Sequence, residues 1–438
     1  MSHKKRLKLA CIGCGARAQT YMRLASLRPD LFEIVAGAAP SAANVEKIRA
    51  ISKNQAFRGF PSAEAMLAAG KLADVLIIAT PDHLHYANCV GALRAGYDIL
   101  LEKPIATTPG EVLEVVRVAR EAGRRVMICF VLRFAAFYRK AREIVCSGAI
   151  GEVVSIQANE GVGPWHQAHS FVRGHWSVAD KSSPMILSKC SHDADIIHWL
   201  VGRRCRRISS FGSLEHFRGE HAPDGAPARC TDGCPVGGTC PYNALRYADD
   251  MRAPWLGMVY GRAAEAPAEE ITQWLRTSPW GRCVYRCDND VVDRQVLAME
   301  FEGGITGTFT MTAFENGRHL EIYGTRGVLK GGETYRRHFG SHLVLFPHEG
   351  APTRYDLKTA EGGGYELHGG GDEGLMDALH GEMTRPLREQ PEAGLESAAH
   401  SHMIAFAAEE ARISGTTVGL EDFEARCASL ARIFHANA

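Results

Sequence analysis

The chain of 438 residues lacks the features that would assign it to a polymer or to a membrane. It carries no net charge, because 50 Lys and Arg residues balance 50 Asp and Glu residues. No global field therefore attracts it to nucleic acid or to anionic lipid. Its apolar runs, such as residues 75–79, are far shorter than the roughly 20 residues that cross a bilayer. We expect a soluble protein with neither a nucleic-acid partner nor a membrane anchor.

An export signal and a disulfide framework are also missing. The apolar run at residues 7–12 is interrupted by Lys8 and followed by a glycine, which is untypical of a signal peptide. The thirteen cysteines are an odd number, and Cys11, Cys89 and Cys129 lie in apolar segments, where a free thiol behaves as a small hydrophobe. We predict reduced cysteines and a cytoplasmic location.

The chain is long enough for two domains, since 45% of its side chains are hydrophobic and one core rarely organises so many residues. Residues 7–130 alternate strand-like runs with amphipathic stretches, a pattern typical of βαβ units around a parallel sheet. The expected strands are Leu7–Ile12, Ile34–Ala38, Val75–Ala79, Asp98–Leu101 and Arg125–Phe130.

Beyond about residue 150 the pattern indicates an antiparallel sheet. Residues 295–301 and 305–312 flank a glycine turn, and residues 320–323 and 328–330 flank another, which predicts two hairpins. Residues 215–290 are rich in Gly, Pro, Cys and Arg with weak periodicity, and we interpret them as an insertion. From Asp372 onward the pattern is mostly helical.

A dinucleotide-binding fingerprint follows the first expected strand. Gly13, Gly15 and Ala18 form G-x-G-x-x-A, with Arg17 inside the motif, at the start of a helix whose N-terminus suits a pyrophosphate. The segment after the second strand lacks the Asp or Glu that binds the adenosine ribose. Ser41 could serve a ribose or a 2′-phosphate, so the sequence favours NAD and leaves NADP open.

Two further turns fall at the carboxyl ends of expected strands, where open α/β sheets bind their ligands. The first contains Thr80, Pro81 and His85, and the second contains Glu102 and Lys103. We predict that both turns contact the cofactor and that Lys103 lies at the nicotinamide.

These motifs resemble those of the Gfo/Idh/MocA oxidoreductases, the family of glucose-fructose oxidoreductase and inositol dehydrogenase. The matching segments, in the family's order, are GCGARA at 13–18, IATPDHLH at 78–85, EKPIA at 102–106, VLRFAAFYRK at 131–140, GAIGE at 148–152 and SHDAD at 191–195. The resemblance implies an α/β fold with a doubly wound Rossmann domain, residues 1–133, and a C-terminal α/β domain, residues 134–438. It also implies a large open antiparallel sheet that supports a homodimer or homotetramer.

The resemblance also implies hydride transfer between a nicotinamide and a hydroxyl-bearing carbon of a sugar or polyol. Glu102 and Lys103 would contact the nicotinamide ribose and the reacting hydroxyl, and His192 would be the acid/base, a task that suits histidine. Where the family often has D-x-G-x-H, this chain has Ser188-Lys189-Cys190-Ser191-His192, so serine replaces the carboxylate. Lys189 or Asp193 is expected to supply the missing polar function.

An aromatic and basic segment at residues 165–176 suits carbohydrate recognition, because sugars present apolar faces and many hydroxyl groups. With the resemblance, the expected substrate-binding residues are Arg133, Tyr138, Trp165, His166, His169, Arg173 and Asp193. The alternative for each single residue is a half-buried structural role.

Five cysteines lie in the insertion as Cys230-x3-Cys234-x5-Cys240 and Cys283-x3-Cys287. Four thiolates could bind a structural zinc ion and order a segment without its own core. Free thiols are the main alternative, and an iron–sulfur cluster or a disulfide is a weaker one.

Our interpretation is an NAD(P)-dependent oxidoreductase of sugars, sugar derivatives or polyols, with Lys103 and His192 handling protons. One alternative is redox-neutral glycoside cleavage, in which transient C3 oxidation permits elimination before the hydride returns. The other is a cofactor-binding sensor without catalysis, which the missing carboxylate before His192 would suit.

Overall fold

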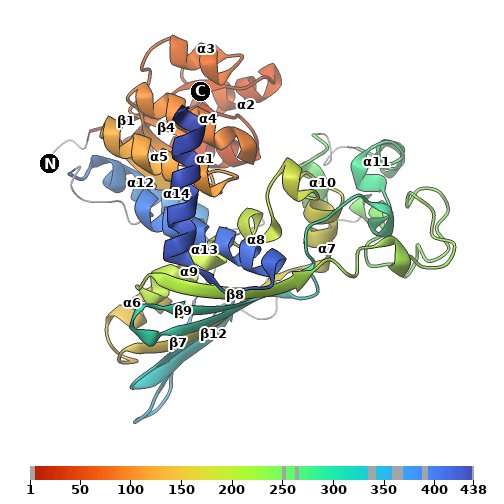
Figure 1. Ribbon diagram of the computed structural model, residues 1–438. Helices are drawn as coiled ribbons and strands as arrows, with labels where there is room; N and C mark the ends of the chain where they lie inside the picture. The colour runs from red at the N-terminus through yellow and green to blue at the C-terminus, as the bar shows by residue number, and fades with distance from the viewer. Residues whose placement is uncertain are drawn as a thin grey trace.

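The computed structural model describes residues 5–248, 253–261, 266–333, 342–357, 368–386 and 393–436. Its first domain contains a six-stranded parallel sheet in the order β3-β2-β1-β4-β5-β6 (Figure 1). The strands are β1 (Leu7–Ile12), β2 (Phe32–Ala38), β3 (Arg58–Phe60), β4 (Val75–Ile78), β5 (Asp98–Leu101) and β6 (Val126–Ile128). The five expected strands are therefore confirmed to within two residues, and the short β3 was missed. The strand order reverses between β1 and β4, where a doubly wound sheet binds its ligand.

Helices follow the strands of this domain as the βαβ pattern requires. They are α1 (Ala16–Ser26), α2 (Ala42–Ser52), α3 (Ala63–Ala68), α4 (His85–Arg94) and α5 (Pro109–Ala122). Strands β4 and β6 are buried along their whole length, because helices cover both faces of the sheet. Helix α5 begins at Thr108, whose hydroxyl accepts from the Glu111 amide at 3.3 Å, with proline at its first position.

The second domain contains a nine-stranded sheet in the order β14-β13-β12-β11-β7-β10-β9-β8-β15. Its strands are β7 (Val153–Val162), β8 (Cys205–Ser213), β9 (Arg294–Phe301), β10 (Thr306–Thr312), β11 (Asn316–Gly324), β12 (Gly327–Glu333), β13 (His342–Pro347), β14 (Thr353–Asp356) and β15 (Val418–Gly419). The hairpins β9–β10 and β11–β12 confirm the expected antiparallel pairs. Strands β7 and β10 pair in parallel, so the sheet is mixed although mostly antiparallel.

One face of this sheet is covered by helices and the other is open. Helices α9 (Ser191–Val201) and α13 (Leu395–Ser414) pack on the covered face, between the sheet and the Rossmann domain (Figure 1). Cross-strand pairing places Phe211 beside Val296, and Phe346 lies on β13 toward the other edge of the sheet; all three side chains are exposed.

The last helices return to the first domain. Helix α12 (Gly371–Thr384) contributes Leu375, Met376 and Leu379 to the hydrophobic cluster that contains β1 and α1, and α14 (Leu420–Ala436) packs on α5. The predicted boundary between the two domains at residue 133 remains a prediction from the sequence. In space, α12 completes the Rossmann core.

The insertion extends away from both sheets, in green in Figure 1. It contains only short helices, among them α10 (Ala253–Gly257) and α11 (Ala268–Leu275). Two small hydrophobic clusters hold it, one around Phe217 and the other around Tyr247. All thirteen cysteines are free thiols, as expected. Among the described residues, no helix has the length and apolarity to cross a membrane.

Candidate active site

The glycine-rich turn between β1 and α1 leaves room for a pyrophosphate. Gly13 has φ +85°, and a Cβ there would lie 2.4 Å from the Ala79 carbonyl oxygen, so only glycine fits. A Cβ on Gly15 would meet no atom within 4 Å. Gly15 is also the N-cap of α1 and has no side chain to cap its amides. The residues therefore fit a dinucleotide phosphate at this helix N-terminus.

Arg17 takes part in an ion-pair network rather than facing the phosphate turn. Its Nε lies 2.7 Å from Glu102 Oε1, and its Nη1 lies 3.1 Å from Asp372 Oδ2. The Tyr21 hydroxyl also donates to Glu102 Oε1 at 2.7 Å. Burial alone would raise the pKa of Glu102, but the charges of Arg17 and Lys103 outweigh it and lower that pKa.

Two loops at the carboxyl ends of β4 and β5 are held together by His85. Its Nδ1 lies 2.6 Å from the Pro104 carbonyl oxygen and its Nε2 lies 2.9 Å from the Thr80 carbonyl oxygen. His85 therefore positions the Thr80–Pro81 turn and the Glu102–Lys103 turn relative to each other. Ser41 lies farther along the same sheet edge, where it caps α2 by accepting from the Asn44 amide at 3.3 Å.

Lys103 reaches from the end of β5 into the second domain. Its Nζ donates to the Ser188 carbonyl oxygen at 2.7 Å, at the end of α8 (Met185–Ser188). Burial lowers the pKa of Lys103, while the charges of Glu102 and Asp82 oppose that effect. The serine that replaces the family's carboxylate thus contributes its backbone oxygen to Lys103.

His192 lies at the start of α9 and faces the same region. Its side chain is 4% exposed, and its Nδ1 has no hydrogen-bond partner among the described residues. Its ring centroid lies 5.7 Å from that of His368, whose Nδ1 lies 3.2 Å from Asp372 Oδ2. Burial lowers the pKa of His192 well below its ordinary value, and the charge of Lys103 lowers it further. At neutral pH the imidazole is uncharged and able to accept a proton.

Lys189 and Asp193 belong to a buried ionic cluster beside this histidine. Lys189 Nζ lies 3.2 Å from Glu160 Oε1, and Arg318 Nε lies 2.6 Å from Glu160 Oε2 and 2.8 Å from Asp193 Oδ1. Burial raises the pKa of Asp193 to about 6, although Arg318 opposes the shift. Lys189 is thus partly buried beside the site, with 14% of its side chain exposed.

Arg133 and Tyr138 lie in the core, which corrects their expected place in the substrate site. Arg133 is 1% exposed and forms two hydrogen bonds with Asp195, of 2.7 and 2.6 Å. That pair joins the segment after β6 to α9. Tyr138 is 3% exposed and packs against Phe137. Neither side chain is available to a substrate.

The segment at 165–176 divides between the site and the insertion. His166 stacks near Trp255, and burial together with the charge of Lys189 lowers its pKa well below the ordinary value. His169 Nδ1 lies 2.6 Å from the Tyr247 hydroxyl, and burial lowers its pKa to about 3. Trp165 packs edge-on against the ring of Tyr247.

Arg173 lies outside the substrate region, which corrects the expectation for this residue. Its guanidinium donates to the carbonyl oxygens of Arg282 and Tyr242, both at 2.7 Å, and to Cys230 Sγ at 3.7 Å. It therefore holds the insertion rather than a sugar.

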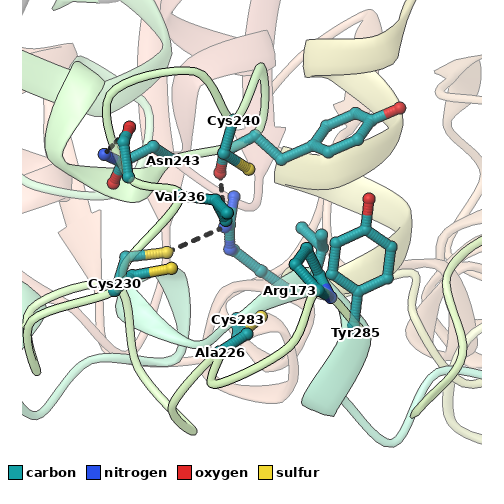
Figure 2. A pocket seen from close by; sticks show the side chains of 13 residues that line it. Arg173, Ala226, Cys230, Val236, Cys240, Asn243, Cys283 and Tyr285 are labelled. Carbon is teal, nitrogen blue, oxygen red and sulfur yellow. Dashed lines mark hydrogen bonds between the residues drawn. The ribbon is translucent and has the colours of Figure 1, made fainter. Parts of the chain in front are cut away.

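Four of the five insertion cysteines line one cavity (Figure 2). They are Cys230, Cys234, Cys240 and Cys283. Cys287 does not line it, and its thiol instead donates to the Cys283 carbonyl oxygen at 3.3 Å.

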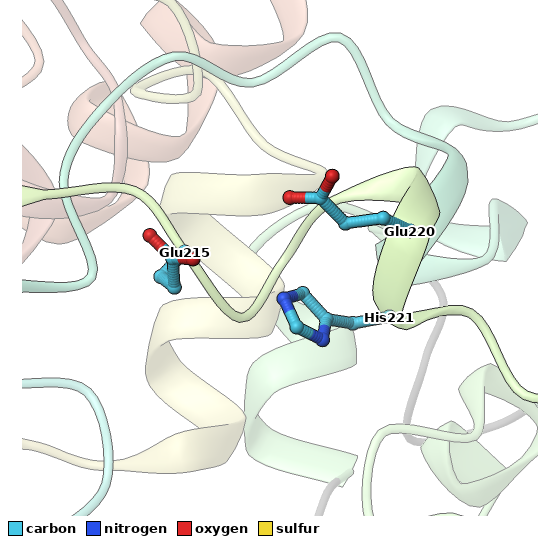
Figure 3. Close-up of side chains that lie close together, drawn as sticks. All are labelled: Glu215, Glu220 and His221. Atoms are coloured by element: carbon cyan, nitrogen blue, oxygen red, sulfur yellow. The ribbon is translucent and has the colours of Figure 1, made fainter.

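Figure 3 shows a separate group of metal-ligand types, Glu215, Glu220 and His221, at the start of the insertion. All three side chains are exposed. Arg218 Nε lies 3.6 Å from Glu220 Oε1, and Arg294 Nη2 lies 3.9 Å from Glu215 Oε2. We assign no ion to this surface group.

Several residues that build the site were not predicted. The Trp176 indole donates to Asp82 Oδ2 at 3.0 Å and so joins the second domain to the turn after β4. His402 Nε2 accepts from the Ile105 amide at 2.9 Å. Asp372 and His368 come from the far end of the chain. No local motif marks these residues, because their roles depend on contacts between distant segments.

Comparison with known proteins agrees with this geometry. Residues 7–130 match the oxidoreductase family model of an NAD-binding Rossmann fold, and residues 142–345 match the model of its C-terminal alpha/beta domain. These matches define an NAD-binding oxidoreductase that acts on CH–OH groups. The chain belongs to the Gfo/Idh/MocA family, as the motifs predicted.

Two relatives and one solved structure illustrate the similarity. The protein YteT of Bacillus subtilis (strain 168), named as a candidate oxidoreductase, is 25% identical over 340 residues, which cover 75% of this chain and 77% of YteT. An inositol 2-dehydrogenase of Leifsonia xyli subsp. xyli is 31% identical over 148 residues, which cover 33% of this chain and only 40% of that enzyme. The WlbA dehydrogenase of Bordetella pertussis, solved with NADH and UDP-GlcNAcA, superposes with a TM-score of 0.63 at 17% identity, covering 95% of this chain and 99% of WlbA. The similarity to WlbA shows that the two chains share a fold.

The glycine turn yields a first prediction. Gly15→Ala should raise the dissociation constant of NAD at least about tenfold, because the new methyl group occupies the space through which the backbone approaches the pyrophosphate. The melting temperature of the apoprotein should be unchanged, since that methyl group meets no protein atom. Isothermal titration and thermal unfolding measure the two effects.

Gly381→Ala is the matched control, because its Cβ also meets nothing within 4 Å but lies on α12. It should bind NAD as the wild type does. Normal NAD affinity in Gly15→Ala would refute this position for the pyrophosphate.

Proposed function

We propose that the protein oxidises a hydroxyl-bearing carbon of a sugar, sugar derivative or polyol, with Lys103 and His192 as its proton-handling residues. The observation that carries the proposal is the approach of Lys103 from the first domain to Ser188, next to the buried His192 of the second. A bound nicotinamide would accept the hydride. The residues of the chain then have to hold the hydroxyl group and remove its proton.

Lys103 and His192 divide that task by charge. The Lys103 ammonium is anchored on the Ser188 carbonyl and has further protons with which to hold a substrate hydroxyl oxygen. His192 is uncharged at neutral pH because burial lowers its pKa, so it accepts the hydroxyl proton. The ring of His368 lies 5.7 Å from that of His192 and is held by Asp372 at 3.2 Å.

The surroundings support a polar substrate with several hydroxyl groups. His166 and Lys189 interact electrostatically with each other near Lys103, and both are side chains with hydrogen-bond donors. The ring of Trp255 lies against His166, and Phe171, which also contacts His166, lies beside Trp176. The names of the inositol dehydrogenase and of the UDP-sugar complex of WlbA are consistent with this class of substrate.

For the cofactor we propose NAD in preference to NADP. Ser41 is occupied as the cap of α2, and no arginine adjoins it in sequence to pair with a 2′-phosphate. Comparison of the two dissociation constants tests this choice.

The proposal predicts that the purified protein reduces NAD in the presence of one or more members of a panel of sugars and polyols. Lys103→Met should lower kcat/KM about 10²–10⁴-fold, the usual contribution of an acid/base group, while NAD binding persists. The control is Lys47→Met, an exposed helix position, which should keep full activity. NAD that returns to its oxidised state while a glycoside is cleaved would instead identify redox-neutral cleavage.

The lowered pKa of His192 yields a pH prediction. A group with a lowered pKa loses its unprotonated, basic form only when the pH falls through that lowered value. The kcat/KM profile should therefore show no titration near 6.5, the ordinary pKa of histidine. The initial-rate profile of NADH formation from about pH 5 to 8, the range in which histidine usually titrates, measures this. An ordinary histidine titration that disappears in His192→Gln would contradict the buried, neutral base.

We also propose that the open sheet face joins copies of the chain into a homodimer or homotetramer. Phe211 and Val296 form an exposed cross-strand pair there, and exposed apolar side chains on a sheet face favour an interface. Light scattering should give a mass of two or four chains, and Val296→Lys should shift it toward one. A monomeric wild type at micromolar concentration would refute the assembly.

A further inference from the structure

A second histidine, His368, lies beside His192 and takes no part in the proton transfer described so far. It reaches the site from the far end of the chain, just before α12 begins at Gly371. The ring centroids of the two histidines lie 5.7 Å apart, with the ring planes inclined at 50°. The charge of a protonated His368 lowers the pKa of His192, so the two imidazoles interact directly.

Asp372 fixes which nitrogen of His368 carries hydrogen. Burial would raise the pKa of Asp372, but the hydrogen bond with His368 and the charge of Arg17 lower it far below its ordinary value. An ionised carboxylate can only accept hydrogen bonds. His368 Nδ1, which lies 3.2 Å from Asp372 Oδ2, is therefore the donor. In the uncharged ring the lone pair is then on Nε2, which is left free to accept a proton.

The surrounding charges make His368 a better proton acceptor than His192. Burial lowers the pKa of both imidazoles. The charge of Lys103, followed by that of Arg318, lowers the pKa of His192 further. For His368 the hydrogen bond and the charge of Asp372 act in the opposite direction and raise the pKa. A proton held by His192 is therefore more stable after transfer to His368.

His192 needs such an acceptor because it is buried. It is 4% exposed, whereas the side chain of His368 is 20% exposed. A substrate hydroxyl that lies against His192 covers the small surface that is open. The Nδ1 atom of His192 is buried and has no hydrogen-bond partner among the described residues. Each oxidation leaves a proton on this ring, and His368 is the adjacent base with access to solvent.

We propose that His368, oriented by Asp372, relays the hydroxyl proton from His192 to solvent; this inference rests on the proposed function. The O–H bond of the substrate breaks and its proton binds one nitrogen of His192, while the hydride leaves the adjoining carbon for NAD. His192 then gives the proton on its other nitrogen to His368 Nε2. His368 releases a proton to solvent, so both rings end uncharged and each NADH is accompanied by one proton.

The transfer between the two rings requires a connection. No direct hydrogen bond joins them within the described residues. One bridging water molecule, or a rotation of either ring, closes a gap of 5.7 Å between centroids. His368 thus acts through His192 and does not itself bind the reacting hydroxyl.

Chemical rescue by a small base tests the relay. The experiment uses the full chain with NAD and the most rapidly oxidised member of the sugar and polyol panel, in a dilute, bulky buffer. His368→Ala should lower kcat at least about tenfold, because proton removal becomes slow, and should leave KM unchanged. Added imidazole should restore kcat, since it replaces the missing ring. It should not raise the rate of the wild type, whose relay is internal.

His348→Ala is the matched control, because it removes an exposed histidine that forms no part of the site. Its kcat should equal that of the wild type with or without imidazole. NAD affinity equal to that of the wild type would show that His368→Ala is folded. If that variant does not fold, His368→Gln serves instead, because its amide retains a donor for Asp372.

The outcomes separate the relay from the proposed function. A variant that keeps the wild-type kcat without imidazole, or one whose lowered kcat does not respond to imidazole, would overturn the relay alone. A wild-type rate that rises with imidazole would also overturn it, and that measurement requires no variant. A wild type that reduces no NAD with any sugar or polyol of the panel would contradict the proposed function and the relay with it.

Discussion

The buried carboxylate of Glu102 is the constraint on which the site depends. It lies at the end of β5 and is 7% exposed, so its charge requires compensation. Arg17 from α1 and the Tyr21 hydroxyl supply it, and Arg17 in turn pairs with Asp372 from α12. A single network therefore joins the glycine-rich turn, the Glu102–Lys103 turn and a helix that returns from more than 350 residues away.

A second ionic cluster performs the same role within the second domain. Glu160 on β7 and Asp193 on α9 share Arg318 from β11, and Glu160 also pairs with Lys189. These contacts fix the start of α9, and hence His192, on the mixed sheet. Because Lys103 reaches Ser188 just before that helix, both networks converge on the lysine–histidine pair. Its geometry is set by buried charges on two different sheets.

The sequence predicted what short-range patterns encode. The strands and the glycine turn follow from local periodicity and φ requirements, and EKP at residues 102–104 marked the turn from which Lys103 reaches the second domain. It did not reveal that Arg133 forms a salt bridge with Asp195 or that Arg173 hydrogen-bonds to the backbone of the insertion. The partner of an arginine is decided by tertiary packing. The contributions of Asp372 and Trp176 were missed for the same reason. Cysteine spacing predicted a common site, and four of the five insertion cysteines line one cavity.

The central claim is that hydride leaves a hydroxyl-bearing carbon of the substrate for the nicotinamide while Lys103 and His192 handle the proton. Its most direct test supplies NAD together with a responsive polyol deuterated at the hydroxyl-bearing carbons, followed by mass spectrometry of the reduced cofactor. The account predicts one deuterium at the nicotinamide ring for each substrate molecule oxidised, and loss of that transfer in Lys103→Met. Product that forms without deuterium ever reaching the nicotinamide would contradict it.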